Sequence, residues 1–170
     1  PAGRFGALDL LRLPRHRKLL TPSLLPALQE MIETGAWWDF CDEISGVALA
    51  RLLQTEPAVM KPLLRQWASG PSMWLRRAAM LSQRSLKTGF DAVLLYDTLQ
   101  PSIAGGQFAD EFFIRKGMGW ALRARCRHAL PAWPSAPGSD PGGPPSMAYS
   151  CRCANAGSCW RTWARCAGST

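Results

Sequence analysis

Two indole rings and two carboxylates lie within one short run of this sequence, Gly35-Ala-Trp-Trp-Asp-Phe-Cys-Asp42. The run stands at the start of an expected helix, so Trp38 and Asp42, four residues apart, would share one helix face. An aromatic wall beside a carboxylate can hold a flat or sugar-like cationic group next to the negative charge. The plainer alternative is that Trp37 and Trp38 belong to the hydrophobic core and that both carboxylates are solvated.

Helical patterns run through the first 125 residues, with short breaks between them. Apolar side chains at Phe5, Leu8 and Leu11 predict a helix over Arg4–Leu13, which Pro14 stops. Start and stop signals predict further helices over residues 22–33, 37–53, 57–69, 73–84, 90–99 and 111–125.

Capping residues support several of these helix starts. Thr21 precedes a proline at the first helical position, and Ser72 can cap the helix over 73–84. Thr88, with Asp91 three residues later, resembles a capping box for the helix over 90–99. No alternating strand pattern competes, so the predicted fold class is all-α.

A repeat of about 38 residues runs through this helical part. Arg77-Ala-Ala-Met and Arg115-Lys-Gly-Met share a pattern 38 residues apart, and Trp37 and Trp74 lie 37 apart. Helix pairs that recur at this length are typical of HEAT-like solenoids, whose inner helices line a concave groove. We therefore expect about three helix pairs in a solenoid; a plain bundle with coincidental spacing is the alternative.

The last part of the chain differs in composition from the rest. From residue 128 onward it is rich in Pro, Gly, Cys, Arg and Trp, with almost no Leu, Ile or Val. Its cysteines lack the paired Cys-x2-Cys knuckles of zinc ribbons. We expect a helical domain over 1–127 and, over 128–170, a poorly ordered tail that has the composition of a shifted reading frame.

The formal net charge of +8 favours a polyanionic partner such as nucleic acid, although an arginine-rich genome would give the same excess. No run of eighteen apolar residues predicts a membrane span, and the start of the chain does not have the pattern of a signal peptide. We therefore expect a cytoplasmic protein that acts at the nucleoid.

Three blocks of sequence carry a resemblance to a known family. They are Thr34-Gly-Ala-Trp-Trp-Asp-Phe-Cys-Asp-Glu-Ile, Ser72-Met-Trp-Leu-Arg-Arg-Ala-Ala-Met-Leu-Ser-Gln and Glu111-Phe-Phe-Ile-Arg-Lys-Gly-Met-Gly-Trp-Ala-Leu-Arg. In this order and spacing they resemble the AlkD-type DNA glycosylases, HEAT-like repeat proteins that excise alkylated purines from DNA. The resemblance covers residues 4 to 125 and implies that the chain begins inside the family domain and departs from it after Arg123.

The resemblance also implies a set of site residues. Asp42 matches the catalytic aspartate of the family, and Trp38 and Trp120 match the aromatic walls that face the deoxyribose of the lesion. Arg77 matches an arginine that holds the DNA backbone near the lesion. Asp39, the other carboxylate of the motif, is interpreted as structural because only Asp42 shares a helix face with Trp38.

The chemistry that these residues imply needs one carboxylate. An N3- or N7-alkylated purine is already cationic and leaves as a neutral base, so Asp42 would stabilise the oxocarbenium-like transition state and orient a water. No metal or other cofactor is expected, and the expected partner is double-stranded DNA that contains alkylated purines, with no obligate protein partner. Arg115 and Lys116 would contact phosphates, or belong to an ordinary basic face. A non-catalytic HEAT-like nucleic-acid-binding or scaffold protein is the alternative function.

Overall fold

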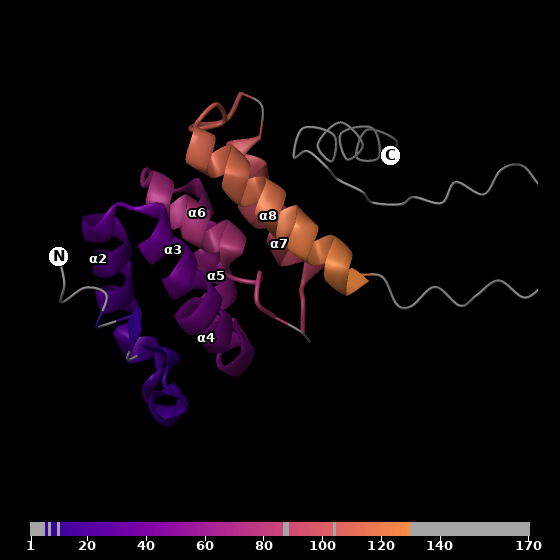
Figure 1. Cartoon of the computed structure of the whole chain (residues 1–170). Coiled ribbons are helices and arrows are strands. Elements are labelled where there is room, and N and C mark those ends of the chain that lie inside the picture. The colour runs from indigo at the N-terminus through magenta and orange to yellow at the C-terminus, as the bar shows by residue number, and fades with distance from the viewer. Residues whose placement is uncertain (1–5, 7, 10, 87–88, 104, 130–170) are drawn as a thin grey trace, which may run out of the picture.

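The computed structural model describes residues 6–129, apart from positions 7, 10, 87, 88 and 104 (Figure 1). The expected tail therefore lies outside the described residues beyond position 129, as do Phe5 and Thr88. Every regular element in the described part is helical, which confirms the all-α prediction. No helix within the described residues is long and apolar enough to cross a membrane.

The elements follow one another with short connections. The α-helices are α2 (Leu25–Gly35), α3 (Trp38–Ile44), α4 (Ala50–Thr55), α5 (Pro57–Ser69), α6 (Met73–Leu81), α7 (Ala92–Leu99) and α8 (Phe112–Ala129). The short 3-10 segments are η1 (Pro14–Leu19), η2 (Pro22–Leu24) and η4 (Gln100–Ser102), and η3 (Ser45–Leu49) is a π-helical turn.

Helix α6 is the centre of the packing. It contacts α2, α3, α5, α7 and α8, and Figure 1 shows it between α3 and α8. All its residues from Leu75 to Leu81 are buried, two arginines among them. Arg77 and Arg115, which match in the 38-residue repeat, lie on two helices that contact each other, α6 and α8.

Two helices, α6 and α7, begin at capping residues whose side chains accept a backbone hydrogen bond. Ser72 is the N-cap of α6, as predicted, and its Oγ accepts a hydrogen bond from the amide of Leu75 at 3.4 Å. The predicted start of α7 at Phe90 is wrong. The helix begins at Ala92, because the carboxylate of Asp91 caps it by accepting from the amide of Leu94 at 3.0 Å.

The helix predicted over 37–53 is interrupted in its middle. The chain continues from α3 into α4 without leaving helical backbone angles, but Ser45–Leu49 forms a π turn. Ser45 lies at the start of this turn, and its hydroxyl donates to the carbonyl of Cys41. Such single π turns inside α-helices often occur at functional sites, and this one follows Asp42 by three residues.

The core has two parts that meet at α6. One consists mainly of residues from α2 to α6, joined by Leu8, Leu20, Leu86 and Leu94. The other fills the space between α6, α7 and α8 with Met80, Leu81, Leu95, Leu99, Ile114 and Ala121. Because α6 contributes to both parts, its buried polar side chains lie between two hydrophobic clusters. One of these side chains, that of Arg77, belongs to the candidate site.

Candidate functional site

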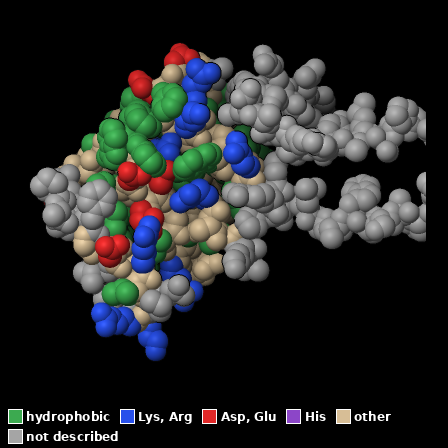
Figure 2. All heavy atoms as spheres, in the orientation of Figure 1, with side chains coloured by type: hydrophobic (Ala, Val, Ile, Leu, Met, Phe, Trp, Pro, Cys, Tyr) green, Lys and Arg blue, Asp and Glu red, His purple; other side chains and the backbone are tan. Residues whose placement is uncertain are grey.

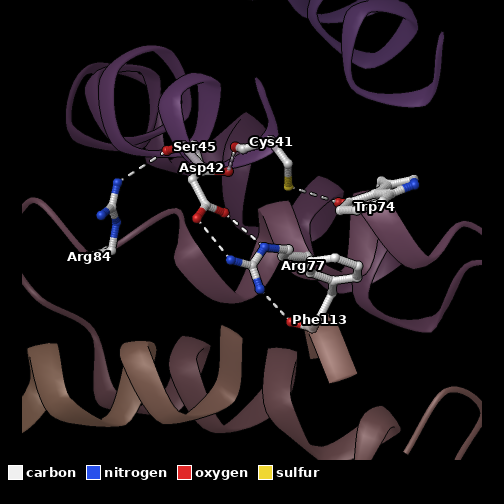
Figure 3. A network of polar contacts seen from close by, with 7 residues as sticks. All are labelled: Cys41, Asp42, Ser45, Trp74, Arg77, Arg84 and Phe113. Carbon is white, nitrogen blue, oxygen red and sulfur yellow. Dashed lines mark hydrogen bonds and ion pairs between the residues drawn. The ribbon is translucent and has the colours of Figure 1, made fainter. Parts of the chain in front are cut away.

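A buried ion pair between α3 and α6 forms the centre of the site (Figure 3). Arg77 donates from Nε to Oδ1 of Asp42 and from Nη2 to Oδ2, each at 2.8 Å. Only 6% of Asp42 and 2% of Arg77 are exposed. Burying two charges is unfavourable unless the geometry is good, and here the planar guanidinium matches the carboxylate with two parallel hydrogen bonds.

Helix α8 supplies the third partner of Arg77. The Nη1 of Arg77 donates to the backbone carbonyl of Phe113, in the first turn of α8. The ring of Phe113 packs against those of Trp74, at 5.3 Å between centroids, and Trp37, at 6.3 Å. These ring contacts hold the first turn of α8 where its carbonyl meets the guanidinium, so all three nitrogens of Arg77 are engaged within the protein.

Gly117 allows α8 to lie this close to α6. A Cβ at position 117 would be 3.2 Å from Nη1 of Arg77 and 3.5 Å from its Cγ. Glycine in a helix costs up to about 1 kcal/mol relative to alanine. The close approach to Arg77 is the physical reason for a small residue at this position.

Trp120 places an aromatic ring beside the ion pair. The Cζ of Arg77 lies 5.9 Å from the centroid of the indole, within the range of cation–π contacts. Trp120 is 37% exposed, so the indole lies at the surface above a buried carboxylate–guanidinium pair. Three of the residues expected at the site, Asp42, Arg77 and Trp120, are thus brought together from three different helices.

The family model of the DNA alkylation repair enzymes matches residues 2–133, most of the chain. The chain belongs to this family. No curated protein shows significant similarity to it.

Membership in the DNA alkylation repair enzymes assigns the chain an enzymatic role in DNA repair, with DNA as its substrate. The face shown in Figure 2 suits that substrate. Lysine and arginine side chains gather there together with hydrophobic ones around a few acidic groups. Cations attract the phosphate backbone, and exposed aromatic rings can contact sugars and bases.

Trp37 and Trp38 lie at the surface, with 51% and 36% of their area exposed, so the interpretation of both as core residues is wrong. Trp38 begins α3 one turn before Asp42. Asp39, which is partly buried, lies in the first turn of α3, where a carboxylate stabilises the helix N-terminus.

Arg115 and Lys116 do not approach Asp42. Both side chains are exposed on α8, and Nζ of Lys116 lies 5.4 Å from the ring centroid of Phe112. They are thus available to a phosphate backbone that passes along the first half of α8, and they take no part in the buried pair.

Cys41, the neighbour of the carboxylate, is buried in the hydrophobic core. Its Sγ donates to the carbonyl of Trp74 at 3.3 Å, which links α3 to α6. Burial, together with the negative charge of Asp42, raises the pKa of the thiol to about 12. Among the described residues no cluster of three or more histidine, cysteine, aspartate or glutamate side chains could hold a metal ion.

Arg84 is the residue that sequence reasoning missed. It lies in the turn after α6, donates from Nη2 to the backbone carbonyl of Asp42 at 3.2 Å, and lies 5.6 Å from the ring centroid of Trp120. One signal could have identified it. Arg84 follows Arg77 by seven residues, the spacing that returns to the same side of a helix.

Proposed function

We propose that this chain is a DNA glycosylase that hydrolyses the N-glycosidic bond of N3- and N7-alkylated purines in DNA. One observation carries the proposal: the carboxylate of Asp42 is held in a fixed orientation by Arg77, and the exposed indole of Trp120 lies against the same guanidinium. Family membership supports the substrate, because it assigns the chain to the repair of alkylated DNA.

The reaction needs charge stabilisation more than acid catalysis. As the alkylated purine leaves, its positive charge moves to the deoxyribose, and the base departs as a neutral molecule. A carboxylate placed beside the sugar stabilises this developing cation most effectively where water is scarce and the anion cannot rotate away. Asp42 meets both conditions, because it is buried and bidentately held.

Asp42 keeps capacity for a substrate although it is paired. Each carboxylate oxygen accepts one hydrogen bond from Arg77 and has a second lone pair. In the proposed mechanism these lone pairs face the sugar cation and orient the attacking water. Trp38 and Trp120 exclude solvent, and their electron-rich faces favour a cationic sugar. The chemistry requires no metal and no other cofactor.

Arg77 acts first as the partner that orients Asp42. Since its three nitrogens already donate to Asp42 and Phe113, a contact with a DNA phosphate would require one of these bonds to be exchanged. Arg115 and Lys116 are exposed, and in the proposal they contact the phosphate backbone.

The test is release of 7-methylguanine from duplex DNA, followed by strand incision at the resulting abasic site. We expect the wild-type chain to release the base and Asp42→Asn to release none. Asp39→Asn is the matched control, because it removes a carboxylate from the same helix three residues away. Loss of activity in both variants, or in neither, would contradict the assignment of Asp42.

One observation favours a second candidate, a non-catalytic DNA-binding module. A bidentate pair between two helices also fits a purely structural role, because it fastens α3 to α6. This candidate predicts DNA binding that weakens steeply with salt, without release of any base.

A further inference from the structure

Arg84 contacts two of the residues in the proposed mechanism, although it belongs to neither of their helices. Its Nη2 donates to the main-chain carbonyl of Asp42 at 3.2 Å, and its Cζ lies 5.6 Å from the ring centroid of Trp120. Asp42 is therefore held at two points, since Arg77 binds its carboxylate and Arg84 binds its backbone (Figure 3).

The π turn after Asp42 is shaped to receive this guanidinium. A Cβ at Gly46 would lie 3.0 Å from Nη2 of Arg84, so a larger residue there would push the guanidinium away. Ser85, the residue that follows Arg84, donates a hydrogen bond from its hydroxyl to the carbonyl of Gly46. The turn that carries Arg84 and Ser85 is thus fastened by one hydrogen bond to α3 and by another to the π turn that follows it.

The charge of Arg84 also reaches the acidic side of α3. Arg12 donates two hydrogen bonds to Glu43, each at 2.7 Å, and lowers the pKa of that carboxyl; Arg84 adds to the effect. The positive charge of Arg84 therefore acts on Glu43, the residue that follows Asp42, and its guanidinium also lies 5.6 Å from the ring centroid of Trp120.

We propose that Arg84 is a positioning residue of the alkylpurine-releasing site, which keeps the π turn and the indole of Trp120 in the geometry that the reaction needs. The inference rests on the proposed function, because a positioning role presupposes a reaction at Asp42. Arg84 lies outside the three sequence blocks that carry the family resemblance, so the resemblance implies no role for it.

The contacts favour positioning over capture of a DNA phosphate. The Nη2 of Arg84 is used by the carbonyl of Asp42, and its Nε is buried, without a hydrogen-bond acceptor in the part of the chain that the structure describes. The side chain as a whole is half-buried. The edge formed by Nε and Nη2 is therefore closed to a bidentate phosphate contact, so we expect the loss of Arg84 to affect the rate of base release more than DNA affinity.

The first experiment compares Arg84→Met, Arg84→Lys and the wild type in single-turnover release of 7-methylguanine, with DNA affinity measured alongside. Arg51→Met is the matched control, because Arg51 is an exposed arginine on α4. We expect Arg84→Met to slow release about 10- to 100-fold, the usual effect of a misplaced catalytic group, with the dissociation constant changed less than about threefold. Lysine should restore part of the rate, because it keeps the cation near Trp120. An unchanged rate at saturating protein, with weakened binding, would make Arg84 a phosphate contact and overturn the proposal.

A second measurement does not depend on activity. The indole N–H signal of Trp120 is assigned in a 15N-labelled sample by its absence in Trp120→Phe. We expect Arg84→Met to move this signal, while the signal of Trp67, which is buried on α5, stays in place. A stationary Trp120 signal would overturn the positioning role. If the wild type releases no base, the proposed function fails, and the indole signal still shows whether Arg84 holds the ring.

Gly46→Ala covers the case in which Arg84→Met does not fold. The added methyl group pushes the guanidinium of Arg84 aside by a few tenths of an ångström and leaves its charge in the protein. We expect a loss of rate in the same direction as that of Arg84→Met, and the wild-type rate in a folded Gly46→Ala protein would contradict the proposal.

Discussion

The buried pair of Asp42 and Arg77 predicts a large energetic coupling between two residues that lie 35 positions apart. Asp42→Leu leaves a buried guanidinium without its anion, and Arg77→Met leaves a buried carboxylate without its cation. Replacing both residues leaves neither charge. The double variant should therefore lose much less stability than the sum of the losses in the two single variants.

The magnitude follows from the burial and the geometry of the pair. Removal of one partner from a buried, hydrogen-bonded ion pair costs about 3–5 kcal/mol. Arg77→Met should also lose about 1 kcal/mol from the hydrogen bond to the Phe113 carbonyl. The double variant escapes the penalty of an unpaired charge, so we expect a coupling free energy of about 3 kcal/mol. The free energy of unfolding of a domain of this kind is about 5–15 kcal/mol. Each single variant should therefore retain only a small part of that stability.

The assay is urea denaturation of the four proteins of the cycle, with stability compared at a single urea concentration. The same substitutions at Arg65 and Asp97 are the control, because this pair joins the same residue types at 2.7 Å but is well exposed. Exposed pairs couple by about 0.2–1 kcal/mol. A coupling free energy of the Asp42 pair no larger than that of the exposed pair would show that burial does not make this pair a fixed element of the site.

Three further predictions concern the surroundings of the site. Gly117→Ala should gain up to about 1 kcal/mol of helix propensity but push against Arg77, so we expect a clear loss of base-release rate with a nearly unchanged melting temperature; a wild-type rate would show that the close approach is unimportant. Asp91 has a lowered pKa because Lys61 and the helix N-terminus stabilise its carboxylate. Its contribution is therefore complete above the pKa of an unfolded aspartate and is lost as the pH falls through the lowered folded value. Asp91→Ala should cost about 1 kcal/mol at neutral pH and much less in strong acid, as measured by denaturation at several pH values, and an equal loss at every pH would contradict this. Cys41, whose pKa is raised to about 12 by burial, should resist iodoacetamide in the native protein and react in urea, as peptide mapping by mass spectrometry would show; rapid native labelling would show that the site is open.

Features that depend on neighbouring residues were predictable from the sequence. The Ser72 cap and the start of α5 at Pro57 follow from local backbone chemistry, and the structure has both. The start of α7 was not predictable, because Thr88 and Asp91 are both good capping residues within one turn. The choice of Asp91 also involves Gln83, whose Oε1 accepts from the amide of Asp91 at 2.7 Å.

Features that depend on contacts between helices could not be derived from spacing. Helical periodicity places Trp38 and Asp42 on one face, but it does not show that Asp42 points at Arg77, 35 residues later. The guanidinium of Arg84 reaches the backbone carbonyl of Asp42 because Gly46, in the π turn, has no side chain to block it. Neither the turn nor this contact follows from the spacing of the residues. The need for a small residue at Gly117 likewise becomes visible only when α8 is packed against α6.

In the proposed mechanism the anion of Asp42 lowers the barrier to base release and contributes little to DNA binding. The most direct test is a single-turnover comparison of the wild type with Asp42→Asn on duplex DNA that contains 7-methylguanine, at protein concentrations that saturate the DNA. We predict a fall in the rate of base release of at least about 100-fold, with a dissociation constant within about threefold of the wild type. A folded Asp42→Asn protein that releases the base at the wild-type rate would show that Asp42 is not the catalytic anion.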